Sequence, residues 1–452
     1  MDLLELLKRP EGKKLEFKRD LSSPDGLLKS IVAFANTAGG TMLIGVEDKS
    51  RHVRGVKDPL ALEERLANLI SDSIAPRLVP DLEILPWRRT HVVAVQVYPG
   101  PNRPYYLKSK GLRDGAYVRI GSTNRRVDQE LAEELRRFAR GEAYDELAMP
   151  ELDSEAIDFR AASESFAHVR RLKRTDLETL RLLTNHQGHK LPTVGGILLF
   201  GKDRGRYFPD AWIQAGRFQG INRTRIVDTS EIHSHPVQAV ADAVAFVEKH
   251  NLRAAEIGVV RRKDRWMLPP VAVREAVINA VVHADYAQRG APIRLAIFSD
   301  RLEIENPGLL PFGLTLDDLH QGVSRLRNRV IGRVFHELGL IEQWGSGIQR
   351  MINACHEAGL PDPLLEEIGT RFRVTIYTIR KHEPSVDAID EAILNTLANG
   401  NGLSTRDISA KINRSPRATR TRLMNLVERG LAREVGTSPQ DPKRQYFLAA
   451  RD

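Results

Sequence analysis

The chain has 452 residues, and a composition with 41% hydrophobic and 28% charged residues excludes a largely disordered protein. The formal net charge of +9 indicates a polyanionic partner, and the single Cys355 excludes both a disulfide framework and a cysteine-based zinc cluster. No apolar run approaches a membrane span and the first residues lack a signal-peptide pattern, so we expect a cytoplasmic protein.

Residues 1–140 predict a mixed α/β domain. The alternating stretch Lys14–Lys18 and the buried stretch Thr41–Val46 are typical of strands, and the helical pattern between them ends near Gly39 and Gly40. Further helices and strands are expected in chain order at Asp58–Ser73, Leu82–Leu85, Val92–Val97, Ala116–Ile120 and Asp128–Arg140.

This order of elements resembles the Schlafen AlbA-type domain. The residues that carry the resemblance include Leu15-Glu-Phe-Lys18, Ala33-Phe-Ala-Asn-Thr37 and Val118-Arg-Ile-Gly-Ser122. The resemblance implies a nucleic-acid-binding domain, and some Schlafen proteins cut RNA with three carboxylates. We therefore expect nucleic acid, either RNA or DNA, as a partner of this domain.

Three acidic positions fall where such a carboxylate set would lie: Glu11, Glu16 and either Glu47 or Asp48. Clustered carboxylates repel one another and are rarely assembled without a cation, so Mg²⁺ or Mn²⁺ is the expected ligand. Lys18 shares the strand face of Glu16 and could hold a phosphate. The alternative is that Glu11 is a solvated turn residue and Glu16 pairs with a neighbouring cation.

Residues 141–250 predict a linker followed by an α/β spacer with no catalytic pattern. We interpret the apolar run Pro192–Gly201 as a buried strand and Trp212–Gly220 as a second strand. Helices are expected at Thr175–Thr184 and Pro236–Lys249.

The stretch Arg274–Tyr286 has apolar residues at helical spacing. Glu275 and Asn279 are four residues apart and therefore share one face of that helix. A carboxylate and a carboxamide on an apolar helix are costly to bury without a partner. An amide oxygen can bind a hard cation, and a positioned carboxylate can take a proton from water. The alternative is a surface glutamate and a helix-capping asparagine.

Two later motifs follow this helix. Glu305-Asn-Pro-Gly308 comes after an alternating, strand-like run at Ile293–Ile304, and Gly345-Ser-Gly347 comes before a helical run at Ile348–Ala354. Small residues allow backbone N–H groups to face a phosphate at a helix N-terminus.

In this order the three motifs resemble the N-box, G1 box and G2 box of the GHKL ATP-binding superfamily. More narrowly, they look like the ATPase-type domain of bacterial proteins labelled RecG-like or transcriptional regulators. The label implies no helicase activity, because no Gly-x4-Gly-Lys-Ser/Thr P-loop occurs in the chain.

The resemblance implies that residues 251–382 form a GHKL-like α/β sandwich that binds ATP and Mg²⁺. Asn279 would hold the cation, and Glu275 would orient or deprotonate the attacking water. Most of the superfamily has Asp-x-Gly-x-Gly in the G1 box, so here either Glu305 or Asn306 replaces that aspartate, or the base is read differently. The other residues expected at the nucleotide are Gly308, Gly345, Ser346 and Gly347.

Residues 385–452 predict a winged helix-turn-helix, and residues 400–452, with 11 Lys and Arg against 5 Asp and Glu, carry +6 of the net charge of +9. Three helices are expected, at Ile389–Leu397, at Ser404–Ile412 with Ser404 as N-cap, and from Pro416 to about Arg429. A β-hairpin wing is expected at Leu431–Val435 and Arg444–Leu448.

The third helix would present basic side chains to a DNA major groove, with further basic residues in the wing. The predicted contacts are Arg417, Arg420, Arg422, Lys443 and Arg444. The alternative is a winged helix that binds protein and has a solvated basic face.

These patterns predict a multidomain α/β (α+β) protein: a mixed-sheet Schlafen AlbA-type domain, a GHKL-like sandwich and a winged helix. We interpret it as an ATP-responsive nucleic-acid-binding regulator of transcription or defence that forms a homo-oligomer. One alternative is a metal-dependent Schlafen-like nuclease using Glu11, Glu16 and Asp48. A second alternative is a pseudo-ATPase scaffold. The chain could thus be an ATPase, an endonuclease or no enzyme.

Overall fold

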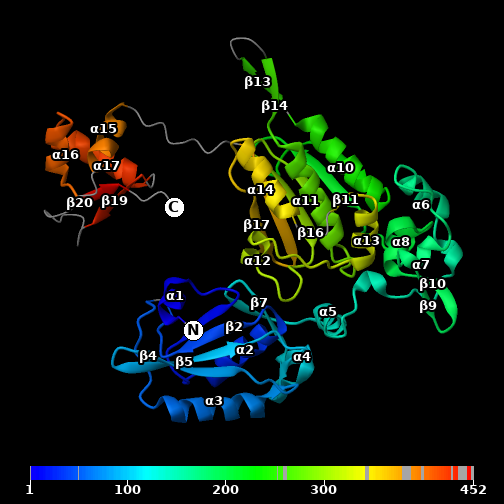
Figure 1. The fold of residues 1–452 in the computed structure, drawn as a ribbon, viewed down its shortest axis with the longest axis horizontal. Helices are drawn as coiled ribbons and strands as arrows, with labels where there is room; N and C mark the ends of the chain where they lie inside the picture. Colours follow the sequence, from blue (N-terminus) through cyan, green and yellow to red (C-terminus); the bar gives the residue numbers. More distant parts are fainter. Residues whose placement is uncertain are drawn as a thin grey trace. The chain divides into compact units, whose positions relative to one another are not determined.

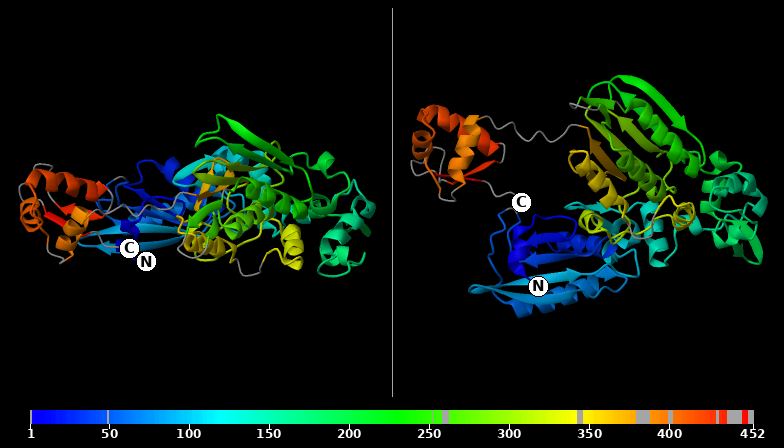
Figure 2. Two further views of the ribbon diagram at one scale, coloured as in Figure 1. Left: turned by 90° about the horizontal axis from the view of Figure 1, so that it is seen from above. Right: turned by 45° about the horizontal axis from the view of Figure 1, so that its top comes forward.

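A computed structural model covers the chain, and Figures 1 and 2 show its ribbon. The residues that the structure describes are 2–48, 50–251, 253–257, 262–341, 346–378, 388–398, 402–428, 431–435 and 445–448. The chain divides into two units, Met1–Thr378 and Ile379–Asp452, which we describe separately. Within the first unit we call residues 2–139 the N-terminal domain and residues 143–378 the central domain.

The N-terminal domain is built on a four-stranded mixed sheet with strand order β1-β2-β5-β4, in which only the β1–β2 pair is parallel. Apolar side chains on its two faces form separate cores, one of which includes α2 and α3. The predicted elements of this domain are confirmed, and the strand predicted at Ala116–Ile120 is β7, which pairs with the additional strand β8. In chain order the elements are α1 (Leu3–Lys8), β1 (Leu15–Lys18), α2 (Pro24–Asn36), β2 (Gly40–Ile44), α3 (Pro59–Ser73), β3 (Ile74–Ala75), β4 (Asp81–Trp87), β5 (Thr90–Val97), β6 (Tyr106–Leu107), α4 (Gly111–Gly115), β7 (Tyr117–Ile120), β8 (Thr123–Arg126) and α5 (Gln129–Ala139).

The central domain is built on a six-stranded sheet with strand order β12-β11-β15-β16-β18-β17. Helices α10, α11 and α14 pack together beside it and share one apolar core with it. The elements are α6 (Phe159–Phe166), α7 (Asp176–Thr179), β9 (Leu183–His186), β10 (His189–Pro192), α8 (Val194–Phe200), α9 (Arg204–Tyr207), β11 (Ile213–Phe218), β12 (Ile226–Ile232), α10 (Pro236–His250), β13 (Arg253–Ile257), β14 (Arg262–Trp266), α11 (Pro270–His283), β15 (Ile293–Ile297), β16 (Arg301–Pro307), α12 (Leu316–His320), α13 (Arg329–Glu337), α14 (Gly347–Glu357), β17 (Leu364–Ile368) and β18 (Arg371–Tyr377).

Three predictions about the central domain were wrong. The apolar run at 192–201 is helix α8, because Thr193 caps it by accepting a hydrogen bond from Gly196 N–H at 2.9 Å. The single strand predicted at 293–304 is an antiparallel pair, β15 and β16. Most of the helix expected at 175–184 is also missing, since α7 is one short turn and β9 begins at Leu183.

The predicted domain boundary at residue 250 does not separate two cores. Strand β11 lies before it and pairs in parallel with β15, which lies after it. The stretch expected to be a spacer thus supplies two strands of the six-stranded sheet.

The second unit has the predicted winged-helix elements. They are α15 (Ala388–Leu397), α16 (Thr405–Lys411), α17 (Pro416–Glu428) and the antiparallel pair β19 (Ala432–Val435) and β20 (Gln445–Leu448). Ser404 and Asp407 form the capping box of α16, as the sequence predicts. In the described part of the chain, none of the helices has the length and apolar character needed to cross a membrane.

Candidate functional site

The predicted N-box lies on helix α11, where its two polar residues face the beginning of α14. Glu275 is 3% exposed, and its Oε1 lies 3.0 Å from Nη2 of Arg350 on α14. Helix α14 starts close to Glu275 and Asn279. A Cβ added at Gly347 would lie 2.8 Å from Glu275 Oε2 and within 3.8 Å of the Asn279 amide. The structure therefore brings Glu275, Asn279 and Gly347 together as predicted.

The amide of Asn279 has a buried atom that the protein does not satisfy. Its Nδ2 is buried, and among the described residues it has no hydrogen-bond partner. His283 Nδ1, one turn further along α11, is likewise buried without a partner in the described chain. Burial, assisted by the positive charge of Arg327, lowers the pKa of His283 to about 4, so the ring is neutral at neutral pH. Buried polar groups are nearly always hydrogen-bonded, so these two atoms mark a place where a ligand would be favoured.

The cavity beside Asn279 has a volume of about 110 Å³. Apolar side chains of residues 309–326, which we call the covering segment, occupy much of its wall; they are Leu309, Leu310, Pro311, Leu314, Leu319, Val323 and Leu326. Sites for small organic ligands usually measure about 300–1,000 Å³. The arrangement described here is therefore a closed one, with the covering segment packed against the N-box.

Asn306, not Glu305, lines this cavity. Successive residues of β16 point to opposite faces of the sheet, so Asn306 faces α11 while Glu305 faces away. Glu305 is instead held by Arg223 and Arg373, at 3.0 and 2.6 Å. Burial acts to raise the pKa of Glu305, but the hydrogen bonds from these two guanidinium groups outweigh it and lower that pKa. Of the two residues predicted at this position, the structure therefore places Asn306, and not Glu305, at the cavity.

The glycine-containing motifs have different roles. Gly308 has a φ of +96°, and an added Cβ would lie 2.9 Å from Cβ of Asp285, so a side chain there would be strained and would clash. Its N–H donates to Thr370 O at 2.8 Å and is not available to a phosphate. Ser346 is the N-cap residue of α14, and the predicted Gly345 lies outside the described residues.

The N-terminal carboxylates do not form the predicted cation site. Glu16 is ion-paired with both Lys18 and Arg119, and Glu11 Oε1 accepts the N–H of Phe17 at 2.6 Å. Burial raises the pKa of Glu11, and the negative charges of Glu16 and Asp48 add to this, so the three groups are neighbours. In the described chain, however, no group of three His, Cys, Asp or Glu side chains is arranged to hold a metal ion.

The physical reason is that the buried Arg119, only 1% exposed, supplies the positive charge that a cation would otherwise provide. Glu47, the fourth candidate, is also engaged, by Arg54 and by the Ser50 hydroxyl at 2.7 Å.

The winged helix presents two of its three predicted arginines. Arg417 and Arg420 are exposed on α17. Arg422 is partly exposed and pairs with the buried Asp390 of α15 at 3.2 Å, which ties its side chain to the core of the second unit; its predicted contact with DNA stays a prediction. Lys443 and Arg444 lie outside the described residues.

The covering segment also contacts the N-terminal domain, which the sequence did not indicate. Phe312 joins an apolar cluster with Val118 and Leu135 of that domain and lies edge-on to Phe138, with ring centroids 5.7 Å apart. Asp318 forms an ion pair with Lys14 at 3.2 Å. The segment is therefore in contact with the N-box on one side and with the N-terminal domain on the other.

Arg327, which directly follows the covering segment, also contacts the N-terminal domain. Arg327 is 9% exposed and ion-paired with Glu134 on α5, while its Nη2 donates to Leu309 O at 2.5 Å. Next to it, Asn328 donates from Nδ2 to Val282 O and Ala284 O, at 2.9 and 2.7 Å, and so ties the end of α11 to the start of α13.

Three family models match the chain. They are Schlafen, AlbA_2 over residues 11–128; HATPase_c_4, described as "Putative ATP-dependent DNA helicase recG C-terminal", over 290–376; and HTH_24, a winged helix-turn-helix DNA-binding family, over 386–439. The chain has a Schlafen AlbA_2 domain, a RecG-type ATPase domain and a winged helix. The match to the ATPase domain begins after α11, so the N-box itself rests on the geometry described above.

Two solved structures are similar to the chain. A crystal structure of the DIP2311 protein from Corynebacterium diphtheriae is 20% identical over 96% of this chain and 92% of that chain, with a TM-score of 0.45. The solution NMR structure of the N-terminal domain of a RecG-related protein from Nitrosomonas europaea is 25% identical over 27% of this chain and 91% of that chain, with a TM-score of 0.21. None of the curated proteins compared matches the chain.

Together the AlbA_2 domain, the ATPase domain and the winged helix give the architecture of a DNA-binding regulator with an ATPase-type module. These matches confirm the family resemblances and the fold class that the sequence predicts.

Proposed function

We propose that the protein is a DNA-binding transcriptional regulator whose ATPase domain responds to ATP and Mg²⁺ in the cavity beside the N-box. The observation that carries this proposal is the Asn279 amide, whose buried Nδ2 has no partner in the described chain, next to Glu275 and Gly347. An N–H donor without a partner favours a ligand with acceptor oxygens, such as the phosphates of ATP. A carboxamide oxygen is a suitable ligand for Mg²⁺, which usually takes one or two protein ligands and keeps several waters.

The residues present fit this ligand. Asn279 would hold the cation, Asn306 lines the cavity where the base or ribose would be read, and Gly347 leaves the space at the start of α14 that a side chain would fill. Mg²⁺ would supply positive charge to screen the phosphates. Glu275 could orient a water, but its pairing with Arg350 must weaken for it to accept a proton.

Binding would displace the covering segment, because a cavity of about 110 Å³ cannot hold a nucleotide. The same segment carries Phe312 and Asp318, which contact the AlbA_2 domain. A ligand shifts an equilibrium between two conformations by its difference in affinity for them. We infer that ATP favours a conformation in which the contacts between the covering segment and the AlbA_2 domain are released.

The test of this proposal is ATP-binding calorimetry with the full chain. Asn279→Ala should weaken Mg²⁺-dependent ATP binding at least about tenfold, since the cation loses its protein ligand. Asn353→Ala, an exposed asparagine on α14 outside the cavity, is the matched control and should bind as wild type does. Glu275→Gln should retain binding and lose any hydrolysis. Equal ATP affinity in wild type and Asn279→Ala would refute the N-box site.

A separate expectation concerns DNA binding by the winged helix. Arg417→Ala and Arg420→Ala should each weaken duplex DNA binding, because each variant loses one basic side chain that displaces counterions from a DNA phosphate. Each should also reduce the steepness of log affinity against log salt concentration by about 1. Arg422→Ala should instead lower the melting temperature of the second unit, because the buried Asp390 loses a cationic partner. Fluorescence anisotropy at several salt concentrations measures the first effect and calorimetric melting the second. If Arg422→Ala abolished DNA binding without a change in stability, while Arg417→Ala and Arg420→Ala bound normally, Arg422 and not Arg417 or Arg420 would be the DNA contact on α17.

A further inference from the structure

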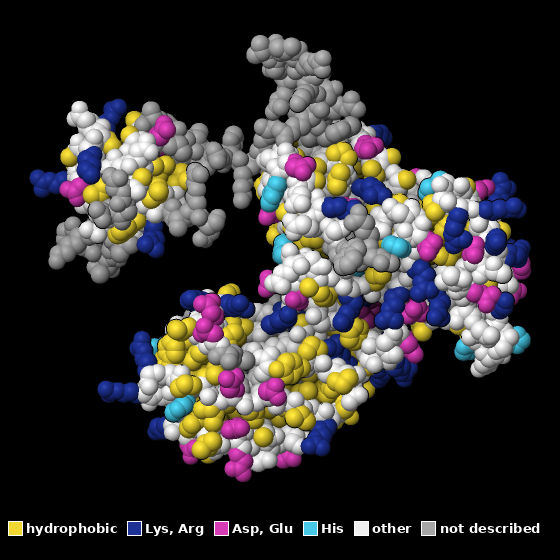
Figure 3. All heavy atoms as spheres, in the orientation of Figure 1, with side chains coloured by type: hydrophobic (Ala, Val, Ile, Leu, Met, Phe, Trp, Pro, Cys, Tyr) yellow, Lys and Arg dark blue, Asp and Glu magenta, His cyan; other side chains and the backbone are white. Residues whose placement is uncertain are grey.

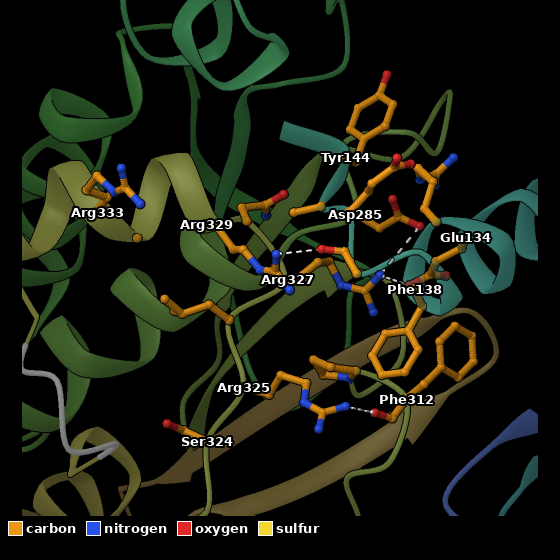
Figure 4. A pocket seen from close by; sticks show the side chains of 18 of the residues that line it. Glu134, Phe138, Tyr144, Asp285, Phe312, Ser324, Arg325, Arg327, Arg329 and Arg333 are labelled. Atoms are coloured by element: carbon orange, nitrogen blue, oxygen red, sulfur yellow. Dashed lines mark hydrogen bonds and ion pairs between the residues drawn. The ribbon is translucent and has the colours of Figure 1, made fainter. Parts of the chain in front are cut away.

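A second, larger cavity lies on the other side of the covering segment, between α5 of the N-terminal domain and α13 of the central domain (Figure 4). Its volume is about 750 Å³, within the range of about 300–1,000 Å³ that is usual for small-molecule sites. Five arginines line it: Arg137, Arg325, Arg327, Arg329 and Arg333. In Figure 3, Lys and Arg side chains gather over α13 and near α5.

Three of these guanidinium groups have no carboxylate partner within the described residues. Arg325 Nη1 donates to Phe312 O at 2.8 Å, Arg333 Nη1 donates to Thr179 O at 2.9 Å, and Arg137 lies over the Tyr144 ring. Each arginine has five N–H donors, so most donors of these three side chains stay free to bind an anion.

Three acidic residues, Glu134, Glu142 and Asp285, line the cavity against five arginines, so its wall keeps an excess of positive charge. Glu134 is used by Arg327, and Asp285 accepts the N–H of Ala287 at 3.2 Å and the side-chain amide of Gln288 at 3.1 Å. The cavity wall also contains two buried polar atoms without a partner in the described chain, Arg327 Nε and Asn328 Oδ1. Asn328 is 1% exposed, so an unsatisfied atom there is costly unless a ligand or water contacts it.

The aromatic rings of the cavity are already in use. The Phe138 ring is covered by Arg325 at 5.1 Å and meets Phe312 edge-on, and Arg137 covers the Tyr144 ring at 5.2 Å. Bases of single-stranded nucleic acid are bound mainly by stacking on free aromatic faces. The cavity therefore favours recognition of phosphate oxygens, which planar guanidinium groups bind in a bidentate way.

We propose that this cavity binds a compact ligand with two or more phosphate groups, and that this ligand is additional to the nucleotide beside the N-box. The two cavities share wall residues of the covering segment, namely Pro311, Ser324, Arg325 and Leu326. A phosphate ligand in the larger cavity would contact this segment directly. The proposal stands on the arginine cavity alone and does not require that ATP binds beside Asn279.

The experiment is a calorimetric titration of the full chain with inorganic tripolyphosphate in the absence of Mg²⁺. Wild type should bind with 1:1 stoichiometry, and Arg333→Ala should weaken binding about tenfold, as expected for loss of a charged hydrogen bond. Arg333→Lys should recover part of the affinity. Arg65→Ala removes another exposed helical arginine, on α3 and outside the cavity wall, and is the matched control.

Two further variants separate this site from the others. Asn279→Ala should bind tripolyphosphate as wild type does, so a failed ATP site and a failed arginine site give different results. The Arg417→Ala, Arg420→Ala double variant should also bind unchanged. Equal affinity in wild type and Arg333→Ala, or an equal loss in Arg65→Ala, would overturn the proposal. Displacement of tripolyphosphate by a short single-stranded DNA at equal phosphate concentration, lost in Arg333→Ala, would overturn the assignment to a compact ligand.

Discussion

Replacing Asp145 with alanine should destabilise the first unit by about 3–5 kcal/mol. This carboxylate is fully buried and accepts the backbone N–H groups of Arg329, Val330 and Ile331, at 2.9, 2.7 and 3.0 Å. It therefore caps the N-terminus of α13 from another part of the chain, and alanine would leave three buried donors unsatisfied. Urea unfolding followed by circular dichroism measures the change.

Asp145→Asn is the matched control. Burial raises the pKa of Asp145 to about 7 although the three N–H groups oppose this. The uncharged asparagine keeps one acceptor oxygen, which can take the N–H groups of Val330 and Ile331 but not that of Arg329. We expect the asparagine variant to lose no more than about half as much stability as the alanine variant. Equal losses for both variants would show that the cap contributes little and that the cost arises from packing.

The second large effect is expected at Arg327. Its methionine variant should lower stability by about 3–5 kcal/mol, because Glu134 would remain in the interface between the two domains without its cation. Asp285, whose Oδ2 lies 4.0 Å from Arg327 Nη1, would lose a favourable charge as well. Differential scanning calorimetry of the full chain detects this as a lower melting temperature of the first unit.

The double variant Arg327→Met, Glu134→Gln distinguishes an ion pair from packing. Replacing both members of a buried pair is often close to neutral, whereas removing one is strongly destabilising. Recovery of most of the lost stability in the double variant is the expected result. No recovery would mean that Arg327 acts mainly through its hydrogen bond to Leu309 O.

Local patterns predicted much of the fold because they depend on neighbours in sequence. The four-residue spacing of Glu275 and Asn279 placed both on one face of α11, and the pair Ser404 and Asp407 predicted the cap of α16. The apolar run at α8 failed because all seven of its residues are buried. Such a run shows neither the period of a strand nor that of a helix.

The features that the sequence did not predict concern partners that are distant in sequence. Choosing Asn306 over Glu305 requires knowing which face of β16 the helices cover. Arg422 pairs with Asp390, 32 residues away, and Asp145 caps a helix that begins 184 residues later. No spacing rule connects such pairs, so only the folded arrangement could identify them.

The pairing of β11 with β15 also has a consequence for folding during synthesis. The four-stranded sheet of the AlbA_2 domain is complete once Val97 is made, whereas the six-stranded sheet needs every strand up to Tyr377. At about 5–20 residues per second, ribosomes would need roughly 15–60 s to cover that distance. During part of this time β11 has β12 beside it but no partner on its other edge, and an open strand edge invites pairing with other chains. Newly made ATPase domain would therefore be the part of this protein most dependent on chaperones.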